Sequence, residues 1–152
     1  MSDKNLVGRC GIYCGGCPVY LASHGGDEKA KFDLAFSIRC TLDQVRCEGC
    51  GSPDRFELSE GCTYRKCADD HGVISCGECN EFPCGSLQQL YGQDVEKWKA
   101  APENAKRIKE IGVERWLEEI GDKNRCKHCD SKLPIGAKSC CICGALVIND
   151  TK

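Results

Sequence analysis

Cysteine constrains this chain more than any other residue type, because 16 of its 152 residues are cysteines. They fall into four groups, which span residues 10–17, 40–67, 76–84 and 126–143. In a short secreted protein this density would indicate a disulfide framework. The first residues, MSDKNLVGRC, contain no apolar run of signal-peptide length. We therefore expect a cytoplasmic protein with reduced thiols, in which clustered cysteines bind metal or act in redox chemistry.

The length of the chain allows one small domain and one appended module. We expect a cysteine-rich metal-binding domain over residues 1–121 and a zinc ribbon over residues 122–152. No stretch approaches the roughly 20 apolar residues of a membrane span, so we expect no membrane contact. The formal net charge is −2, with a mildly acidic body and a mildly basic tail. Neither part has the dense basic stripe of a phosphate-binding surface, so an unknown protein is favoured over nucleic acid as the partner.

The segment of about 40 residues between the third and fourth cysteine groups has a helical composition. Ser86 opens SLQQLYG, Asp94 opens DVEKWKA, and Pro102 occupies a first-turn position before ENAKRIKEIGVERWLEEIG. Gly112 is expected to divide the last stretch into two helices, and Gly121 to end the second. The second of these helices should bury one apolar face, formed by Val113, Trp116, Leu117 and Ile120.

A further helix is predicted from Asp27 to about Ile38. Phe32, Ala35 and Phe36 share one face of it, which we expect to pack into the core. Strand signals are weak throughout. The sequence thus predicts a small, metal-stabilised, mainly helical fold with irregular cysteine-rich loops, followed by a ribbon of small β structure. Metal cross-links would compensate for the few large apolar side chains in the body.

The tail sequence CKHCDSKLPIGAKSCCICGA contains two C-x-x-C pairs separated by ten residues. Each pair can form a tight turn that points two thiolates at one position, and two such turns supply the tetrahedron that zinc prefers. Pro134 and Gly136 lie where the chain must reverse. The predicted ligands are Cys126, Cys129, Cys140 and Cys143. Four ligands leave no open position, so this site should be structural.

The tail resembles the short zinc ribbons that end many bacterial and archaeal proteins. The resemblance rests on the two cysteine pairs and on Gly136, Ala137, Gly144 and Ala145. Asp130 stands where those ribbons usually have glycine, which predicts a strained turn with its ligands intact. Cys141 is the spare thiol, because only Cys140 keeps the two-residue gap to Cys143. His128 is expected to face solvent.

The first cysteine group presents Cys10, Cys14 and Cys17 in the order C-x3-C-x2-C. A thioredoxin-like redox site would use Cys14 and Cys17 followed by Pro18, but no βαβ pattern surrounds them. The same spacing resembles that of radical S-adenosylmethionine enzymes. Those enzymes normally have an aromatic residue where this chain has Gly16, and their barrel needs more residues than are present here. An iron–sulfur cluster remains possible in residues 1–121, because thiolates bind both zinc and iron.

The segments CGIYCGGCPVYLA, CEGC, CTYRKCA and CGECNEFPCGSL resemble, in order and spacing, the domain of unknown function 3795 family, over roughly residues 8–120. This resemblance implies a small cysteine-rich protein that binds zinc or an iron–sulfur cluster, and it implies no particular activity. Ser59 stands where the family often has a further cysteine. Cys40 is an alternative ligand for that position, although its isolation at the end of a helix favours a free thiol.

Ten patterned cysteines in residues 1–121 exceed the eight needed by two four-cysteine sites. They are Cys10, Cys14, Cys17, Cys47, Cys50, Cys62, Cys67, Cys76, Cys79 and Cys84. The pairs Cys47/Cys50 and Cys62/Cys67 form one plausible tetrad, and the third group would then take its fourth ligand from the first. With the tail, this predicts about three zinc ions. His24 and His71 are either substitute ligands or surface residues.

The sequence contains no Ser-His-Asp constellation, phosphate loop or H-E-x-x-H motif, which favours a non-enzymatic protein. We interpret the chain as a zinc-binding protein whose metal is mainly structural, acting as an adaptor or scaffold for a macromolecule. Two alternatives stay open: an iron–sulfur redox protein or enzyme, and a metal chaperone or sensor. Spacing alone does not decide which cysteines share a metal.

Overall fold

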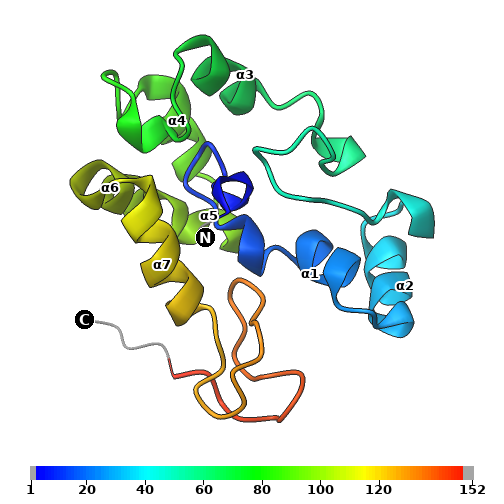
Figure 1. The fold of residues 1–152 in the computed structure, drawn as a ribbon. Helices are drawn as coiled ribbons and strands as arrows, with labels where there is room; N and C mark the ends of the chain where they lie inside the picture. The colour runs from blue at the N-terminus through cyan, green and yellow to red at the C-terminus, as the bar shows by residue number, and fades with distance from the viewer. Residues whose placement is uncertain (1–2, 149–152) are drawn as a thin grey trace.

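The computed structural model describes residues 3–148 and shows a mainly helical chain, which confirms that part of the predicted fold class (Figure 1). The α-helices are α1 (Pro18–His24), α2 (Glu28–Ser37), α3 (Thr63–Asp70), α4 (Gly85–Tyr91), α5 (Glu96–Lys99), α6 (Ala101–Ile111) and α7 (Val113–Lys123). Single 3-10 turns precede α1 or lie between the helices: η1 (Lys4–Leu6), η2 (Cys14–Gly16), η3 (Leu42–Gln44), η4 (Glu57–Ser59) and η5 (Cys76–Glu78). No helix within residues 3–148 is long and apolar enough to cross a membrane.

The predicted β ribbon in the tail is wrong. Residues 3–148 contain no strand, only isolated antiparallel bridges, of which Arg125–Lys132 and Ser139–Leu146 lie in the tail. The first bridge cannot extend into a ladder because the chain before Arg125 is helical: α7 continues to Lys123, and the N–H of Asn124 bonds to Ile120. The N–H of Ile135 donates instead to the carbonyl of Gly16, in the body, at 2.8 Å. The tail is therefore two cysteine turns held by single bridges.

The largest core lies between η1, α6 and α7. Val7, Ile108, Val113, Trp116 and Leu117 are buried there, so the predicted apolar face of α7 is confirmed. Gly112, at a φ of 83°, separates α6 from α7 as expected.

Gly121, however, does not end α7, which continues to Lys123. Its φ does not lie in the left-handed region, and the N–H of Asn124 bonds to Ile120 as in a continuing helix. The prediction of a glycine cap at this position was wrong because the backbone never enters the left-handed conformation there.

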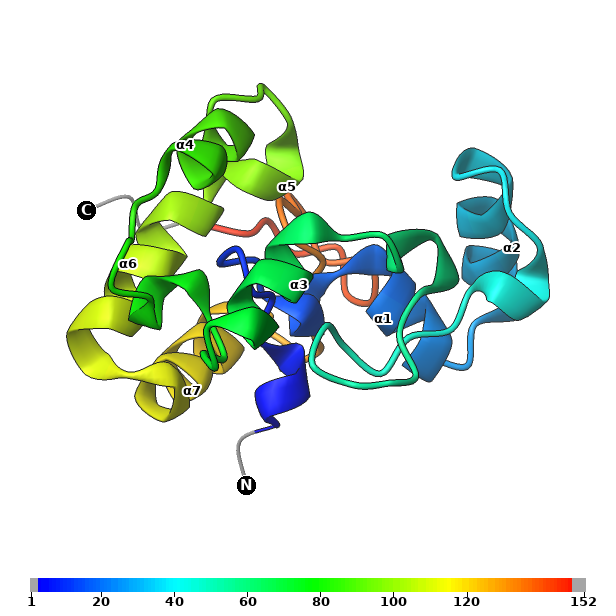
Figure 2. The ribbon, with the colours of Figure 1, turned by 90° about the horizontal axis from the view of Figure 1, so that it is seen from above.

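Helix α2 begins where predicted, with the carboxylate of Asp27 accepting the N–H of Ala30 at 3.1 Å. Its phenylalanines do not pack in the core: Phe32 is 57% and Phe36 is 80% exposed, whereas Ala35 is buried. Figure 2 shows the reason, because α2 lies at one end of the molecule with its neighbours, α1 and η3, on one side only. The apolar face that the sequence predicted is thus divided between core and solvent.

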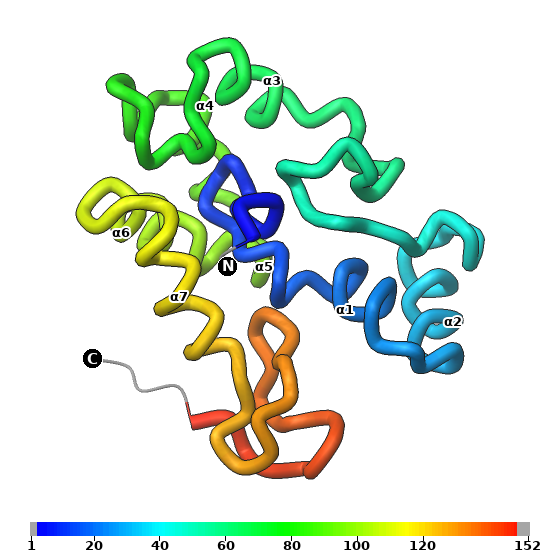
Figure 3. The backbone as a smooth tube through the Cα atoms, in the orientation of Figure 1, coloured from blue at the N-terminus to red at the C-terminus, as the bar shows by residue number. Residues whose placement is uncertain are grey.

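The N-terminal segment runs through the middle of the molecule and connects its two sides (Figure 2). The carbonyl of Asn5 accepts the N–H of Gly51 at 3.1 Å, and the carbonyl of Arg9 accepts the N–H of Cys76 at 2.7 Å. Figure 3 shows the long connection after η3 passing from the α2 end to α3. This path brings cysteines from distant parts of the sequence together.

Candidate metal centres

Four cysteines of the tail form a compact cluster, which we call the tail tetrad: Cys126, Cys129, Cys140 and Cys143. Their sulfur atoms all lie within 4.8 Å of one another. The Sγ atoms of Cys126 and Cys143 are 3.6 Å apart, and those of Cys129 and Cys140 are 3.7 Å apart. Zinc–sulfur bonds of about 2.3 Å give a regular tetrahedron with edges of about 3.8 Å. The tail tetrad thus has the dimensions of a site for one metal ion.

Two similar turns build the tail tetrad. The N–H of Asp130 bonds to the carbonyl of Cys126 at 2.8 Å, and the N–H of Gly144 bonds to that of Cys140 at 2.9 Å. Each turn ends in a left-handed residue, with a φ of 59° at Asp130 and 72° at Gly144. The left-handed conformation disfavours a residue with a side chain, so Asp130 is strained at a position where similar ribbons have glycine, as predicted from the sequence. Arg125 holds Asp130 through bonds to its carbonyl and its carboxylate, at 3.1 and 3.3 Å.

In the body, the turn between Cys14 and Cys17 lies next to the turn between Cys47 and Cys50. The N–H of Gly49 donates to the sulfur of Cys47 at 3.3 Å, and the backbone N–H of Cys50 donates to the thiol of Cys14. Burial raises the pKa of Cys14, and the neighbouring charges of Cys50, Cys17 and Cys47 raise it further. Thiolates that repel one another in this way are stabilised by a cation between them. These two turns could hold a metal.

A third thiol group surrounds a small cavity and consists of Cys67, Cys76, Cys79 and Cys84. Within residues 3–148, the tetrad expected from spacing, Cys47 and Cys50 with Cys62 and Cys67, does not gather within the 4.8 Å that the tail tetrad meets. The fold pairs the turn at Cys47 with the first cysteine group and places Cys67 with the third. Sequence spacing identified the local turns but could not show which turns face each other.

A family model described as "Protein of unknown function (DUF3795)" matches residues 6–89. The chain belongs to the DUF3795 family. The match contains every cysteine of the body, from Cys10 to Cys84, and ends within α4, earlier than the resemblance over residues 8–120 suggested. The tail tetrad lies outside it. Searches among curated proteins and among solved structures found no match to this DUF3795 protein.

Four cysteines of the DUF3795 protein lie outside the three thiol groups. Cys10 is buried with Leu87 and Leu90 in a cluster against which Cys76 and Cys84 also pack. Burial raises its pKa to about 12, and the neighbouring charges of Cys50, Cys62 and Cys76 contribute to the rise. Cys62 precedes α3, Cys40 is partly buried against the core beside α2, and Cys141 is exposed. Cys10 and Cys62 were both predicted as ligands, and that role stays a prediction.

The two histidines considered as substitute ligands each donate from Nδ1 to a carbonyl oxygen, at 2.8 Å. His24 bonds to Tyr20 and also reaches the carboxylate of Glu48 at 3.1 Å through Nε2. His71 bonds to Cys67 in the last turn of α3. A carbonyl can only accept, so Nδ1 carries the hydrogen in both rings and is not free to bind metal.

Ser131 is a functional residue that the sequence reasoning missed. Its hydroxyl lies 3.1 Å from the sulfurs of both Cys129 and Cys140. This hydroxyl and the backbone N–H groups of Cys143 and Ile142 lower the pKa of Cys140 to about 6. A thiolate is therefore present at neutral pH, which is the form that binds metal. The sequence signal for this role was the position of Ser131, two residues after Cys129 of the first C-x-x-C turn.

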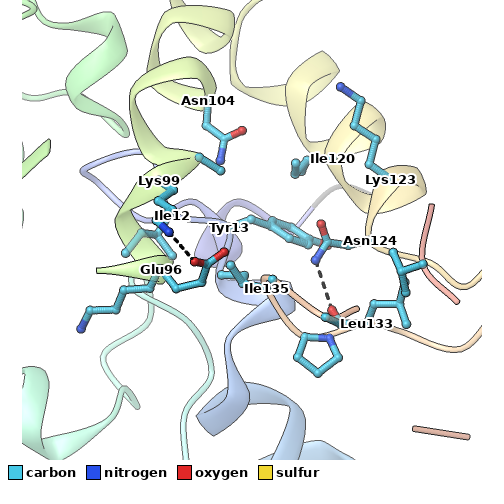
Figure 4. Close-up of a pocket in the computed structure, with 16 residues that line it drawn as sticks. Ile12, Tyr13, Glu96, Lys99, Asn104, Ile120, Lys123, Asn124, Leu133 and Ile135 are labelled. Carbon is cyan, nitrogen blue, oxygen red and sulfur yellow. Dashed lines mark hydrogen bonds and ion pairs between the residues drawn. The ribbon is translucent and has the colours of Figure 1, made fainter. Parts of the chain in front are cut away.

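The tail of the DUF3795 protein docks on the body at a cleft of about 290 Å³ (Figure 4). Tyr13, Asn124 and Ile135 line it, and the side-chain amide of Asn124 donates to the carbonyl of Leu133 at 3.1 Å. Gly16 lies directly beneath, where a side chain would collide with Asn124. The first cysteine turn of the body therefore supports the tail through its backbone. This contact requires glycine at residue 16, so the aromatic residue that radical S-adenosylmethionine enzymes normally have at this position would not fit.

Proposed function

We propose that this DUF3795 protein is a zinc-binding protein whose metal is structural and which acts as a scaffold for another macromolecule. The observation that carries the proposal is the tail tetrad. Its four sulfurs have the spacing of ligands around a single ion, and four thiolates fill the tetrahedral coordination of zinc. No position is left for a substrate or a reactive water, so the centre supports structure rather than catalysis.

The surface beside the tail tetrad supports the scaffold role. Ile142, Leu146 and Ile148 are 72%, 81% and 83% exposed. Leu146 and Ile148 line the same hollow of the surface, and exposed apolar side chains that lie together are typical of a protein–protein contact. Residues 122–152 contain no Phe, Trp or Tyr, so the tail lacks the stacking platforms of single-strand nucleic-acid binders. A protein is therefore the partner that we propose.

Metal removal tests the structural role. In zinc-finger peptides, bound zinc contributes about 10–16 kcal/mol, which is comparable with the whole stability of a small domain. Treatment with a strong chelator should abolish the native tail signals in an NMR spectrum, and addition of zinc should restore them. Elemental analysis verifies the removal. Unchanged NMR and circular dichroism spectra in the verified metal-free protein would show that the metal is not structural.

Substitution of the apolar tail surface tests the scaffold role separately. The double variant with Ile142→Ser and Leu146→Ser should keep its zinc, because neither side chain is a ligand. When the chain is immobilised and exposed to an extract of its source cells, the variant should fail to capture proteins that the native chain captures. A matched double variant at exposed lysines, Lys127→Ser with Lys138→Ser, should retain them. Equal retention by the native chain and the isoleucine–leucine variant would contradict a contact at this surface.

A further inference from the structure

A small cavity in the body is surrounded by four cysteine side chains. Its volume is about 30 Å³, and Cys67, Cys76, Cys79 and Cys84 line it together with apolar groups such as Phe82 and Leu87. Cysteine thiolates are soft ligands that bind zinc and iron. Four cysteine side chains around one space are therefore a candidate metal centre.

Several independent contacts hold these four cysteines in place. The Cys76 N–H donates to the carbonyl of Arg9 at 2.7 Å, which fixes the start of η5. Ser75 is fully buried, and its hydroxyl accepts the N–H of Gly77 at 3.2 Å. On the opposite wall, the guanidinium of Arg9 bonds to Asp69 at 3.1 Å, next to Cys67 in α3. The same arginine thus fixes both walls of the cavity.

The sulfur spacing in the body differs from that in the tail. In the tail tetrad, all four sulfurs lie within 4.8 Å of one another, with individual separations near the edge length of a zinc tetrahedron. Within residues 3–148, no other three candidate ligand atoms meet that limit. The four thiols around the cavity are therefore spread more widely than thiolates that share one zinc ion.

We propose that Cys67, Cys76, Cys79 and Cys84 bind an iron–sulfur cluster. Such a cluster distributes four thiolates over more than one iron, so the sulfurs stand farther apart than around a single ion. Cys76, Cys79 and Cys84 form C-x2-C-x4-C, and Cys67 precedes Cys76 by nine residues. Plant-type ferredoxins use the same two gaps in the reverse order, with their fourth ligand at a longer separation. This centre goes beyond the zinc function proposed for the tail.

His71 lies beside the centre as a neighbour of one ligand. Its Nδ1 is 3.7 Å from the sulfur of Cys67 and donates to the carbonyl of the same residue. That nitrogen is unavailable to iron because it carries the hydrogen. Hydrogen bonds near cluster sulfurs adjust the reduction potential.

The full chain tests the assignment directly. Protein purified without oxygen, from cells supplied with both iron and zinc, should be brown. It should contain iron and acid-labile sulfide in similar amounts, in addition to the zinc of the tail. Zinc throughout, with no acid-labile sulfide, would overturn the proposal, and this measurement needs no variant to fold.

Two substitutions locate the cluster. Cys79→Ser should lose most of the iron and sulfide while keeping the tail zinc, and its circular dichroism spectrum should show that the helices of the body remain. Cys40→Ser, at a thiol outside the three groups, is the matched control and should keep iron, sulfide and zinc. Cys140→Ser should lose tail zinc but keep iron and sulfide. The zinc proposal for the tail and the cluster proposal for the body can therefore fail independently. Full iron and sulfide content in Cys79→Ser would overturn the ligand assignment.

Discussion

Cys140 and Cys141 are adjacent in the sequence, yet only Cys140 reaches the tail tetrad. Its side chain is 2% exposed, whereas that of Cys141 is exposed at the surface. The N–H of Cys140 bonds to the carbonyl of Ala145, which fixes the orientation of the turn. The two-residue gap to Cys143 was enough to choose between them from the sequence, because two thiolates of a C-x-x-C turn can point at one position.

We predict that Cys140→Ser and Cys141→Ser have opposite outcomes. Cys140→Ser removes a thiolate from the tail tetrad, so it should lose one zinc per chain and unfold only the tail. Cys141→Ser should leave the zinc content and the NMR shifts of the tail nearly unchanged. Elemental analysis and two-dimensional NMR of the variants check both results. Equal zinc loss from the two variants would show that the tail does not form the tetrad described.

At the scale of elements, the packing of η5 on α6 controls the position of Cys76 and Cys79. Gly77 is buried, and a Cβ at this position would collide with the backbone carbonyl of Ala105 in α6. Backbone cannot move aside as a flexible side chain can. Gly85, at the start of α4, has open space around it and serves as a control.

We predict that Gly77→Ala lowers the free energy of unfolding by about 1–3 kcal/mol, which is typical of overpacking, and weakens metal retention in the body. Gly85→Ala should change both quantities little. Denaturant unfolding with elemental analysis provides the comparison. If Gly77→Ala and Gly85→Ala behave alike, η5 does not pack on α6 as closely as described.

A bidentate ion pair joins α6 to α7. The guanidinium of Arg107 donates from Nε and Nη2 to the two carboxylate oxygens of Glu119, at 3.0 and 2.8 Å. These hydrogen bonds hold the pKa of Glu119 below its ordinary value of 4.5. A carboxylate with a lowered pKa stabilises the fold above its ordinary pKa, and this stabilisation is lost as the pH falls through the lowered value.

Glu119→Gln should therefore lower the melting temperature by a few degrees at neutral pH, and the difference from the native chain should shrink in acid below pH 4.5. Both side chains are partly exposed, so the effect should be modest and should weaken in salt. Glu118→Gln, at an exposed position on the same helix, should have little effect. A difference that does not change between neutral and acidic pH would rule out the ion pair as its cause.

Local signals predicted α2 and the helices between residues 85 and 123, but they missed α1 and α3 and predicted the outcome of tertiary packing poorly. Asp27 and Pro102 mark helix starts because capping and proline geometry are local properties. Phe32 and Phe36 were placed in the core on periodicity, which indicates a face but not whether a neighbour covers it. The tail strands failed because the N–H of Ile135 bonds to the body, a long-range contact that no local pattern contains.

For the whole molecule, the arrangement of cysteines depends on the path of the chain between them. The C-x-x-C turns could be predicted individually from spacing. Their combination into three groups depends on Arg9, on the central N-terminal segment, and on the long connection after η3, which are contacts between residues far apart in sequence. The family match covers the body alone, so it does not explain the docked tail.

If metal holds both the body and the tail, each chain should contain more than one metal centre. We predict three centres in protein purified without oxygen, one in the tail and two in the body, since twelve of the cysteines lie in three groups of four. Elemental analysis of the native chain and of Cys140→Ser should show the loss of one zinc and retention of the body metal. A single bound ion in the native chain, removed entirely by Cys140→Ser, would contradict the account.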